Sequence, residues 1–307
     1  MWDCEESLRE LVRSVEPTAP QKAAASRSQN YVRALLQSGQ FGDRVIGEYL
    51  SGSYARDTAL APIDDVDIII LINPEGWPQN FWSAKPDPER VLQSFARATR
   101  YRYPNSSVHV QRRSVCLTLN HLCIDIVPGI ESHGEGDRIQ IPDTDSGEWI
   151  TSAPKRHTAI ATEINQMHGG RFKPEVKLLK YWNYQLPECA RLKSFAIETL
   201  AATLFSDVDL PSLQEGLGLF FDFLAGQKDQ AVLYQWPKNF GVHMSVWSHK
   251  LPDLAGTGSN LMAKVDDGRR IKFLEQAIRS RDHLIAARKA RSPAAAAERI
   301  GAALRML

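Results

Sequence analysis

Two aspartates at the start of an apolar run are the residues of this sequence best suited to chemistry. Asp65 and Asp67 flank Val66 in DVDIIILI, where the residues after Asp67 are all aliphatic. In a strand, residues two apart project from the same face, so both carboxylates would point together while Val66 points into the core. Two such carboxylates can hold two hard cations about 3.5–4 Å apart, the arrangement of two-metal phosphoryl transfer. A solvated turn is the ordinary alternative, but it does not normally lead into a wholly apolar strand.

A glycine turn precedes this pair in the stretch GSYARDT. Gly52 allows the backbone to come close to a ligand, and backbone N–H groups with the Ser53 hydroxyl could hold a triphosphate. Mg²⁺ prefers oxygen ligands from carboxylates and phosphates. The turn and the aspartates together therefore predict a site for Mg²⁺ and a nucleoside triphosphate.

A third carboxylate, Asp125, lies in the middle of the apolar stretch LCIDIVP. A charge at such a position is costly to bury unless it is paired or bound to a metal. If this stretch is a strand beside 66–72, Asp125 joins the first two aspartates, binds the second metal and helps to activate the attacking hydroxyl. A structural salt bridge is the alternative.

The hydrophobic patterns that must position these residues change along the chain. The first half predicts helices mixed with strands, and the second half predicts helices almost throughout. Predicted helices cover 3–15, 20–38, 87–100, 154–168, 174–185, 194–206, 211–226, 230–235 and 270–290, with a last helix in the C-terminal tail. Strands are predicted at 45–50 and 66–72, and a hairpin at 108–127 uses 114–119 and 121–127. The polar, glycine-rich segment 134–157 is predicted to be irregular, apart from the start of the 154–168 helix.

This order of elements favours an α+β protein with two lobes that meet at a cleft. We expect a catalytic core with a mixed sheet at 1–150 and a helical lobe at 151–307, with the N-terminal helices packed on both. Five basic residues of the late helix form a face that we expect to be solvated: Arg269, Arg270, Lys272, Arg279 and Arg281.

Composition narrows the class of protein. The chain of 307 residues is 43% hydrophobic and 24% charged with a net charge of +1, so it lacks the basic excess of proteins that hold long nucleic acids. It has no leader pattern and no uncharged apolar run of about 18 residues, so we expect a cytoplasmic protein that does not enter a membrane. The four cysteines form no CxxC pair and are expected to be buried free thiols in a reducing cytoplasm.

The order GS, DVD and a later lone aspartate on a strand resembles the polymerase-β-like nucleotidyltransferases. Two later stretches, KLLKYWN from Lys177 and LKSFAIETL from Leu192, resemble the helical lobe of the cGAS/DncV-like nucleotidyltransferases. These bacterial enzymes make cyclic di- and trinucleotide signals in anti-phage defence. The resemblance covers about residues 25–205, and the C-terminal third carries no matching motif.

The resemblance implies further nucleotide-binding residues. Lys180 would contact the donor triphosphate, and Lys177 shares its helical face; a solvated lysine is the alternative. Ser194 would place a hydroxyl on the donor phosphates, although it could be an ordinary N-cap. Asn165 lies where some uridine-using synthases carry an asparagine near the base, and a structural asparagine is equally consistent.

The resemblance predicts an enzyme that uses two Mg²⁺ ions, which Mn²⁺ can replace, to join NTPs into a cyclic di- or trinucleotide and release pyrophosphate. We expect ATP among the substrates, a monomer, and a regulatory protein or a downstream effector that responds to the product. Two alternatives remain. One is a template-independent transferase that acts on RNA 3′ ends, a protein or a small molecule; the other is an inactive nucleotide-binding or scaffold module.

Overall fold

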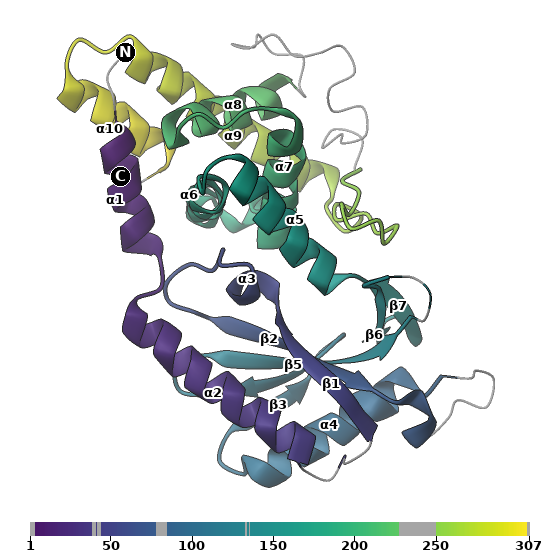
Figure 1. The fold of residues 1–307 in the computed structure, drawn as a ribbon. Helices are drawn as coiled ribbons and strands as arrows, with labels where there is room; N and C mark the ends of the chain where they lie inside the picture. Colours follow the sequence, from purple (N-terminus) through teal and green to yellow (C-terminus); the bar gives the residue numbers. More distant parts are fainter. Residues whose placement is uncertain are drawn as a thin grey trace. The chain divides into compact units, whose positions relative to one another are not determined.

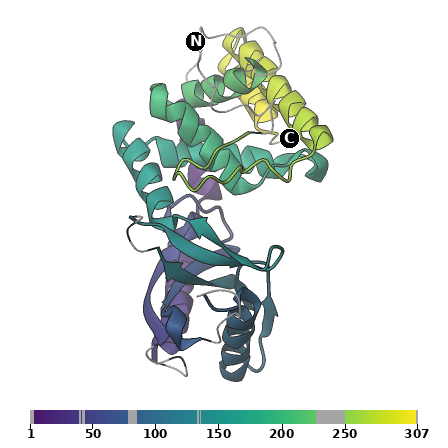
Figure 2. The same ribbon diagram turned by 90° about the vertical axis from the view of Figure 1, so that its right-hand side faces the viewer.

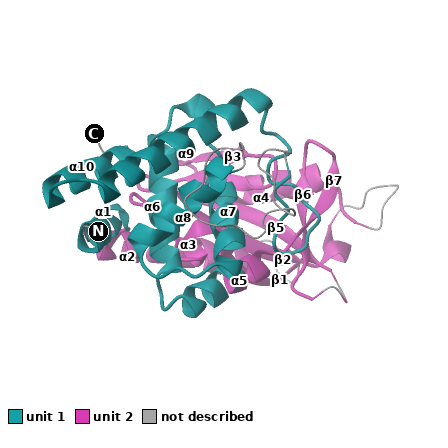
Figure 3. Cartoon of the chain, turned by 90° about the horizontal axis from the view of Figure 1, so that it is seen from above, with its two compact units in different colours: residues 1–16, 160–307 teal, residues 17–159 magenta. Residues whose placement is uncertain are grey.

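The computed structural model divides the chain into two compact units (Figures 1 and 3). Unit 1 contains residues 1–16 and 160–307, and unit 2 contains residues 17–159. The residues that the structure describes are 4–38, 41, 44–77, 85–132, 134, 136–226 and 250–305. The helix expected at 230–235 lies outside these ranges. None of the helices in the described ranges is long and apolar enough to cross a membrane.

Unit 2 is built on a mixed sheet whose main strands follow the order β1-β2-β5-β4-β3. These strands are β1 (Val45–Ser51), β2 (Asp65–Ile72), β3 (Ser107–Val110), β4 (Val115–Thr118) and β5 (Cys123–Glu131). β2 and β5 run parallel, whereas β1 with β2, β3 with β4 and β4 with β5 pair antiparallel. The parallel pair therefore brings the starts of β2 and β5 to the same edge of the sheet.

One face of this sheet is covered by two helices, α2 (Ala19–Ser38) and α4 (Pro88–Arg102) (Figures 1 and 2). The alternate residues of β2 that begin with Val66 share a buried cluster with residues of both helices. The other alternate residues of β2 are Asp65, Asp67, Ile69 and Leu71, which point to the opposite face. Ile69 and Leu71 form a smaller buried cluster there with Val127 and Ile139. The pleat of the strand thus puts the aspartates on the face that α2 and α4 leave uncovered.

The segment expected to be irregular contains a β-hairpin of β6 (Ile139–Asp143) and β7 (Glu148–Ser152), so that prediction was wrong. Its turn is polar, but Asp143 is buried because Arg112 and Arg113 bind its carboxylate at 2.6 Å and 3.0 Å. These bonds lower the Asp143 pKa to about 2. The partners lie in the loop between β3 and β4, so the stability of the hairpin depends on a contact that is distant in sequence.

Unit 1 is helical. Its helices are α1 (Glu5–Val15), α6 (Phe172–Gln185), α7 (Ser194–Asp207), α8 (Leu213–Gly226), α9 (Asp267–Arg288) and α10 (Pro293–Ala303). α5 (Pro154–Met167) contains the boundary between the units, and short 3₁₀ turns lie at Pro74–Gly76 and Glu188–Ala190. The core centres on Trp182, whose ring lies 4.8 Å from that of Phe221 and 5.4 Å from that of Phe273, and whose Nε1 donates to Ser280 Oγ at 2.9 Å.

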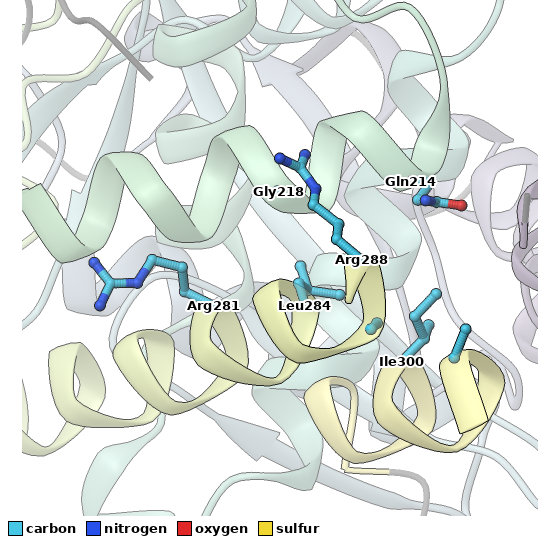
Figure 4. A pocket seen from close by; sticks show the side chains of 8 residues that line it. Gln214, Gly218, Arg281, Leu284, Arg288 and Ile300 are labelled. Carbon is cyan, nitrogen blue, oxygen red and sulfur yellow. The ribbon is translucent and has the colours of Figure 1, made fainter. Parts of the chain in front are cut away.

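A small cavity of about 10 Å³ lies among α8, α9 and α10 (Figure 4), which is room for about one water. Arg281 lines it, and its side chain is only 8% exposed and pairs with Asp282 at 2.9 Å. Arg270 is also buried and pairs with Asp267. The prediction of a solvated basic face was therefore wrong for these two arginines, because α9 turns them toward its packed side, whereas Lys272 and Arg279 are exposed.

Candidate active site

Three aspartates lie on the face of the sheet that α2 and α4 leave uncovered. Asp67 in β2 lies opposite Asp125 in β5, and Asp65 lies opposite Cys123. Val66 between the two β2 aspartates is fully buried, while Asp65 is exposed and Asp67 is half-buried. Alternation within β2 orients the first two carboxylates, and the parallel register brings the third beside them.

Gly52 fits closely against Asp67. It begins the short helix α3 (Gly52–Ala55), which also contains Ser53 and directly follows β1, whose last residue, Ser51, lies opposite Asp67. The φ angle of Gly52 is +70°, and a Cβ added there would lie 1.7 Å from Asp67 Oδ2. Both the backbone conformation and the close approach therefore require glycine at this position.

The carboxylates influence one another electrostatically. Burial and the nearby charges of Asp65 and Asp125 raise the pKa of Asp67 to about 7, and the positive charge of Arg56 opposes this shift. Burial and Asp65 also raise the pKa of Asp125, while a hydrogen bond donated by Ser114 Oγ at 3.3 Å lowers it. Burial and the neighbouring carboxylates together therefore outweigh the compensation from Arg56 and Ser114. An all-oxygen donor set with excess negative charge fits a hard divalent cation.

Arg56 and Ser114 are site residues that the sequence analysis did not find. Arg56 is the C-cap of α3 and is buried. Ser114 precedes β4, and Cys116 of that strand lies opposite Asp125. An arginine within the glycine turn was a local signal that could have been used. The Ser114 contact depends on the β4–β5 register, which no local pattern specifies.

The two lysines carried over from the resemblance lie in α6 of unit 1, and both are buried. Lys180 Nζ pairs with Glu198 at 3.0 Å, and Lys177 Nζ pairs with Glu16 at 2.6 Å. Their side chains are 5% and 3% exposed. These ion pairs fix both ammonium groups within the helical unit, and contact with a triphosphate stays a prediction.

Ser194 and Asn165 have different local environments. Ser194 is exposed and is the first residue of α7, where Lys193 occupies the N-cap position without a side-chain cap. Ser194 is therefore not the N-cap of α7, and that alternative was wrong. Asn165 Oδ1 accepts a hydrogen bond from Lys173 N at 3.0 Å, which ties α5 to the start of α6. A nucleotide-binding role stays a prediction for both residues.

Two cysteines border the carboxylates, and the prediction that all four are free thiols was wrong for them. Cys116 and Cys123 form a disulfide with a Cα–Cα distance of 6.3 Å, whereas Cys4 and Cys189 are free. Cys4 is buried as expected, but Cys189 is exposed. The adjacent strands β4 and β5 bring the two sulfurs together. The sequence showed no CxxC pair because the contact crosses between strands.

Comparisons with known proteins identify the family of the chain. Residues 3–165 match the family described as Second Messenger Oligonucleotide or Dinucleotide Synthetase domain, SMODS. The chain is 34% identical over 208 residues to the cyclic AMP-AMP-AMP synthase of Acinetobacter sp. (strain ATCC 27244 / 9458), covering 64% of this chain and 57% of that protein. It is 29% identical over 183 residues to the cyclic AMP-AMP-AMP synthase of Escherichia coli (strain MS 115-1), covering 57% and 55%. The match thus spans little more than half the length of these relatives.

Solved structures share the fold. The structure of E. coli MS115-1 CdnC with ATP has a TM-score of 0.77 at 21% identity and covers 98% of this chain and 97% of that chain. The Bradyrhizobium diazoefficiens CD-NTase CdnG in complex with GTP has a TM-score of 0.65 at 16% identity, and 97% of each chain is covered. The predicted α+β, polymerase-β-like fold is confirmed. The chain belongs to the SMODS family, and thus to the cGAS/DncV-like members of the nucleotidyltransferase superfamily.

Proposed function

We propose that this chain is a divalent-metal-dependent nucleotidyltransferase that joins NTPs into a cyclic di- or trinucleotide and releases pyrophosphate. The observation that carries the proposal is the register of β2 with β5, which sets Asp67 opposite Asp125 beside Asp65. Membership in the SMODS family supports the same activity.

In this proposal Asp65, Asp67 and Asp125 hold two Mg²⁺ ions, which Mn²⁺ can replace. When bound, the ions neutralise phosphate charge and activate the attacking hydroxyl. Gly52 leaves room for the backbone to approach the carboxylates, and Ser53 offers its hydroxyl to the donor triphosphate. Ser114 orients Asp125 through its hydrogen bond, and Arg56 favours the ionised form of Asp67. Catalysis is then mainly positioning and charge neutralisation.

We further propose that Lys180 and Ser194 bind the donor phosphates. Lys180 carries a positive charge and three N–H donors, and it donates one of them to Glu198. Ser194 is exposed at the start of α7, where backbone N–H groups also favour an anion. Lys177 and Asn165 are proposed as neighbours of the nucleotide.

The relatives suggest which substrate and partner to test first. Two of them are named cyclic AMP-AMP-AMP synthase, so we propose ATP as a substrate and a cyclic triadenylate as the first product to seek. One similar structure is a CdnC:HORMA-deltaN complex, which supports a protein regulator here as well. We also propose a monomeric, cytoplasmic enzyme that acts in bacterial anti-phage signalling.

The test is incubation of the purified protein with the four labelled NTPs and Mg²⁺ or Mn²⁺, with and without tRNA, followed by phosphatase. We expect a phosphatase-resistant small product that depends on ATP and is absent with the Asp67→Asn variant. Label that appears only on RNA or on a protein would reject cyclisation and favour the alternative transferase. No labelled product with either metal, with or without an added HORMA-type regulator, would favour an inactive nucleotide-binding module.

A further inference from the structure

The disulfide lies on the same face of the sheet as the proposed magnesium ligands. Cys123 precedes Asp125 by two residues in β5, and Cys116 lies opposite Asp125 in β4. Residues two apart in a strand, and residues directly opposite in neighbouring strands, share a face. Accordingly, Cys123 Sγ is 4.0 Å from Asp125 Oδ1. The state of the two sulfurs must therefore affect the surroundings of the third carboxylate.

Backbone pairing holds this hairpin together alongside the disulfide. Strands β4 and β5 pair continuously from Val115 opposite Ile126 to Thr118 opposite Cys123. Leu119 N also donates to Leu122 O at 2.9 Å where the turn begins. The bridged cysteines are separated by only 7 positions, and cross-linking a short loop removes less chain entropy than cross-linking a long one. Reduction is therefore expected to leave the backbone hairpin in place.

The reduced pair would form a different kind of metal site from the proposed magnesium site. One ligand atom each from Cys116, Cys123 and Asp125 lies within 4.8 Å of the other two. Two thiolates and a carboxylate suit thiophilic divalent cations such as Zn²⁺ or Cd²⁺, whereas Mg²⁺ favours oxygen ligands. A tetrahedral zinc site separates its sulfurs by about 3.8 Å, which requires only that the two side chains move apart once the S–S bond is broken.

We propose that reduced Cys116 and Cys123, together with Asp125, bind one thiophilic divalent cation and so remove Asp125 from the carboxylate cluster. Reduction by a dithiol breaks the S–S bond, transfers two electrons and two protons to the sulfurs, and converts the reductant into a disulfide. Cation binding then releases the two thiol protons to solvent. The oxidised form offers no thiolate and keeps Asp125 for magnesium. Cation binding does not depend on the proposed function of the chain, whereas inhibition of turnover rests on it.

Cadmium binding tests the site directly. In a Cys4→Ser, Cys189→Ser background, where Cys116 and Cys123 are the remaining cysteines, the protein is reduced with a dithiol, freed of it without oxygen and titrated with Cd²⁺. We expect one equivalent to bind with the ultraviolet charge-transfer absorption of cadmium thiolates. The oxidised protein and the reduced Cys116→Ser variant should show no such absorption. The reduced Asp125→Asn variant should keep the absorption but bind Cd²⁺ at least about tenfold more weakly. Absorption that is missing after reduction, or that persists with Cys116→Ser, would overturn the proposal.

Inhibition of turnover is measured separately on protein that keeps Cys4 and Cys189, with Mg²⁺ in excess and micromolar Zn²⁺. We expect the reduced protein to lose turnover at least tenfold, while the oxidised protein and the reduced Cys116→Ser variant keep theirs. Equal inhibition in all three would overturn the role of Asp125. If no sample forms product without Zn²⁺, the proposed function fails, and the cadmium titration still decides whether the site exists. The comparison of oxidised with reduced wild-type protein needs no substitution, so it holds even if a variant folds poorly.

Discussion

Asp67 in the sheet and Glu175 in the helical unit are both carboxyl groups that folding removes from water, and burial raises the pKa of both. Asp67 has Asp65 and Asp125 as neighbours and is half-buried on the face of the sheet that α2 and α4 leave uncovered. Glu175 is fully buried in α6, where a Cβ on Gly216 of α8 would lie 2.9 Å from its Oε2. Both Glu175 oxygens lack a hydrogen-bond partner among the residues that the structure describes.

The difference lies in how each charge can be neutralised. Glu175 is enclosed, so taking up a proton is the simple way to remove its cost. Asp67 belongs to a cluster that a divalent cation can neutralise from the open side. Two pKa shifts in the same direction thus have different meanings: one indicates a proposed cation site and the other a local cost to stability.

Asp67→Asn should have the largest effect. The substitution keeps the shape but removes a proposed metal ligand, so turnover is expected to fall by about a thousandfold or more. The melting temperature should stay equal or rise, because repulsion among the carboxylates is relieved. Product formation and thermal unfolding measure the two effects, and Asp64→Asn, at an exposed neighbouring position, is the matched control. Turnover within tenfold of wild type would contradict the metal assignment.

Gly52→Ala tests whether the close approach to Asp67 matters beyond backbone conformation. Gly147 has the same φ of +70° with no atom within 4 Å of an added Cβ, so Gly147→Ala isolates the conformational cost of about 1 kcal/mol. Gly52→Ala should lower the free energy of unfolding by about 2–4 kcal/mol, since the clash adds to that cost, and should also reduce turnover. Denaturant unfolding measures the first effect. Equal losses in the two variants would show that the contact with Asp67 is unimportant.

Stability measured over a pH series with and without Mg²⁺ should distinguish the contribution of Asp67 from that of Glu175. A raised folded-state pKa means that the folded protein holds the proton more tightly, so stability is lost as pH rises from the unfolded value toward the folded one. For Asp67 that window runs from about 4 to about 7, and the loss should be roughly 2–4 kcal/mol. Mg²⁺ should restore this part at pH 8 and bind about tenfold more tightly there than at pH 6. Melting curves with and without Mg²⁺ test this, and Asp67→Asn should abolish the Mg²⁺-dependent part.

Glu175 should give a magnesium-independent part of the same pH dependence. Glu175→Met replaces the carboxyl with an apolar side chain of similar size and should raise the free energy of unfolding at pH 7 by about 1–3 kcal/mol. The gain should shrink as pH falls toward the ordinary glutamate pKa, because the unfolded chain then also holds the proton. Glu175→Gln separates the loss of charge from the loss of polarity. A destabilised Glu175→Met protein at pH 8 would show that the carboxyl has a favourable partner.

Local patterns predicted the start of the candidate site better than its surroundings. Alternation in DVDIIILI is sufficient to orient Asp65 and Asp67, because side-chain direction in a strand depends on the strand alone. The β6–β7 hairpin was missed because the burial of Asp143 depends on arginines of another loop. The Cys116–Cys123 bond and the Ser114 contact were missed for the same reason, since both depend on the register of β4 with β5. The proposed roles of Lys180 and Ser194 came from resemblance and remain predictions.

The parallel pairing of β2 with β5 also has a consequence for the order of folding. Asp65 and Asp67 leave the ribosome well before Asp125, with the whole crossover 73–122 between them. Parallel pairing across such a distance must first overcome the entropy of closing a long loop, so it forms late. A nascent chain would therefore carry two carboxylates without the third, and tight binding of Mg²⁺ would report that the central sheet has closed. Because the ion binds the folded form selectively, it would also slow the reopening of that pair.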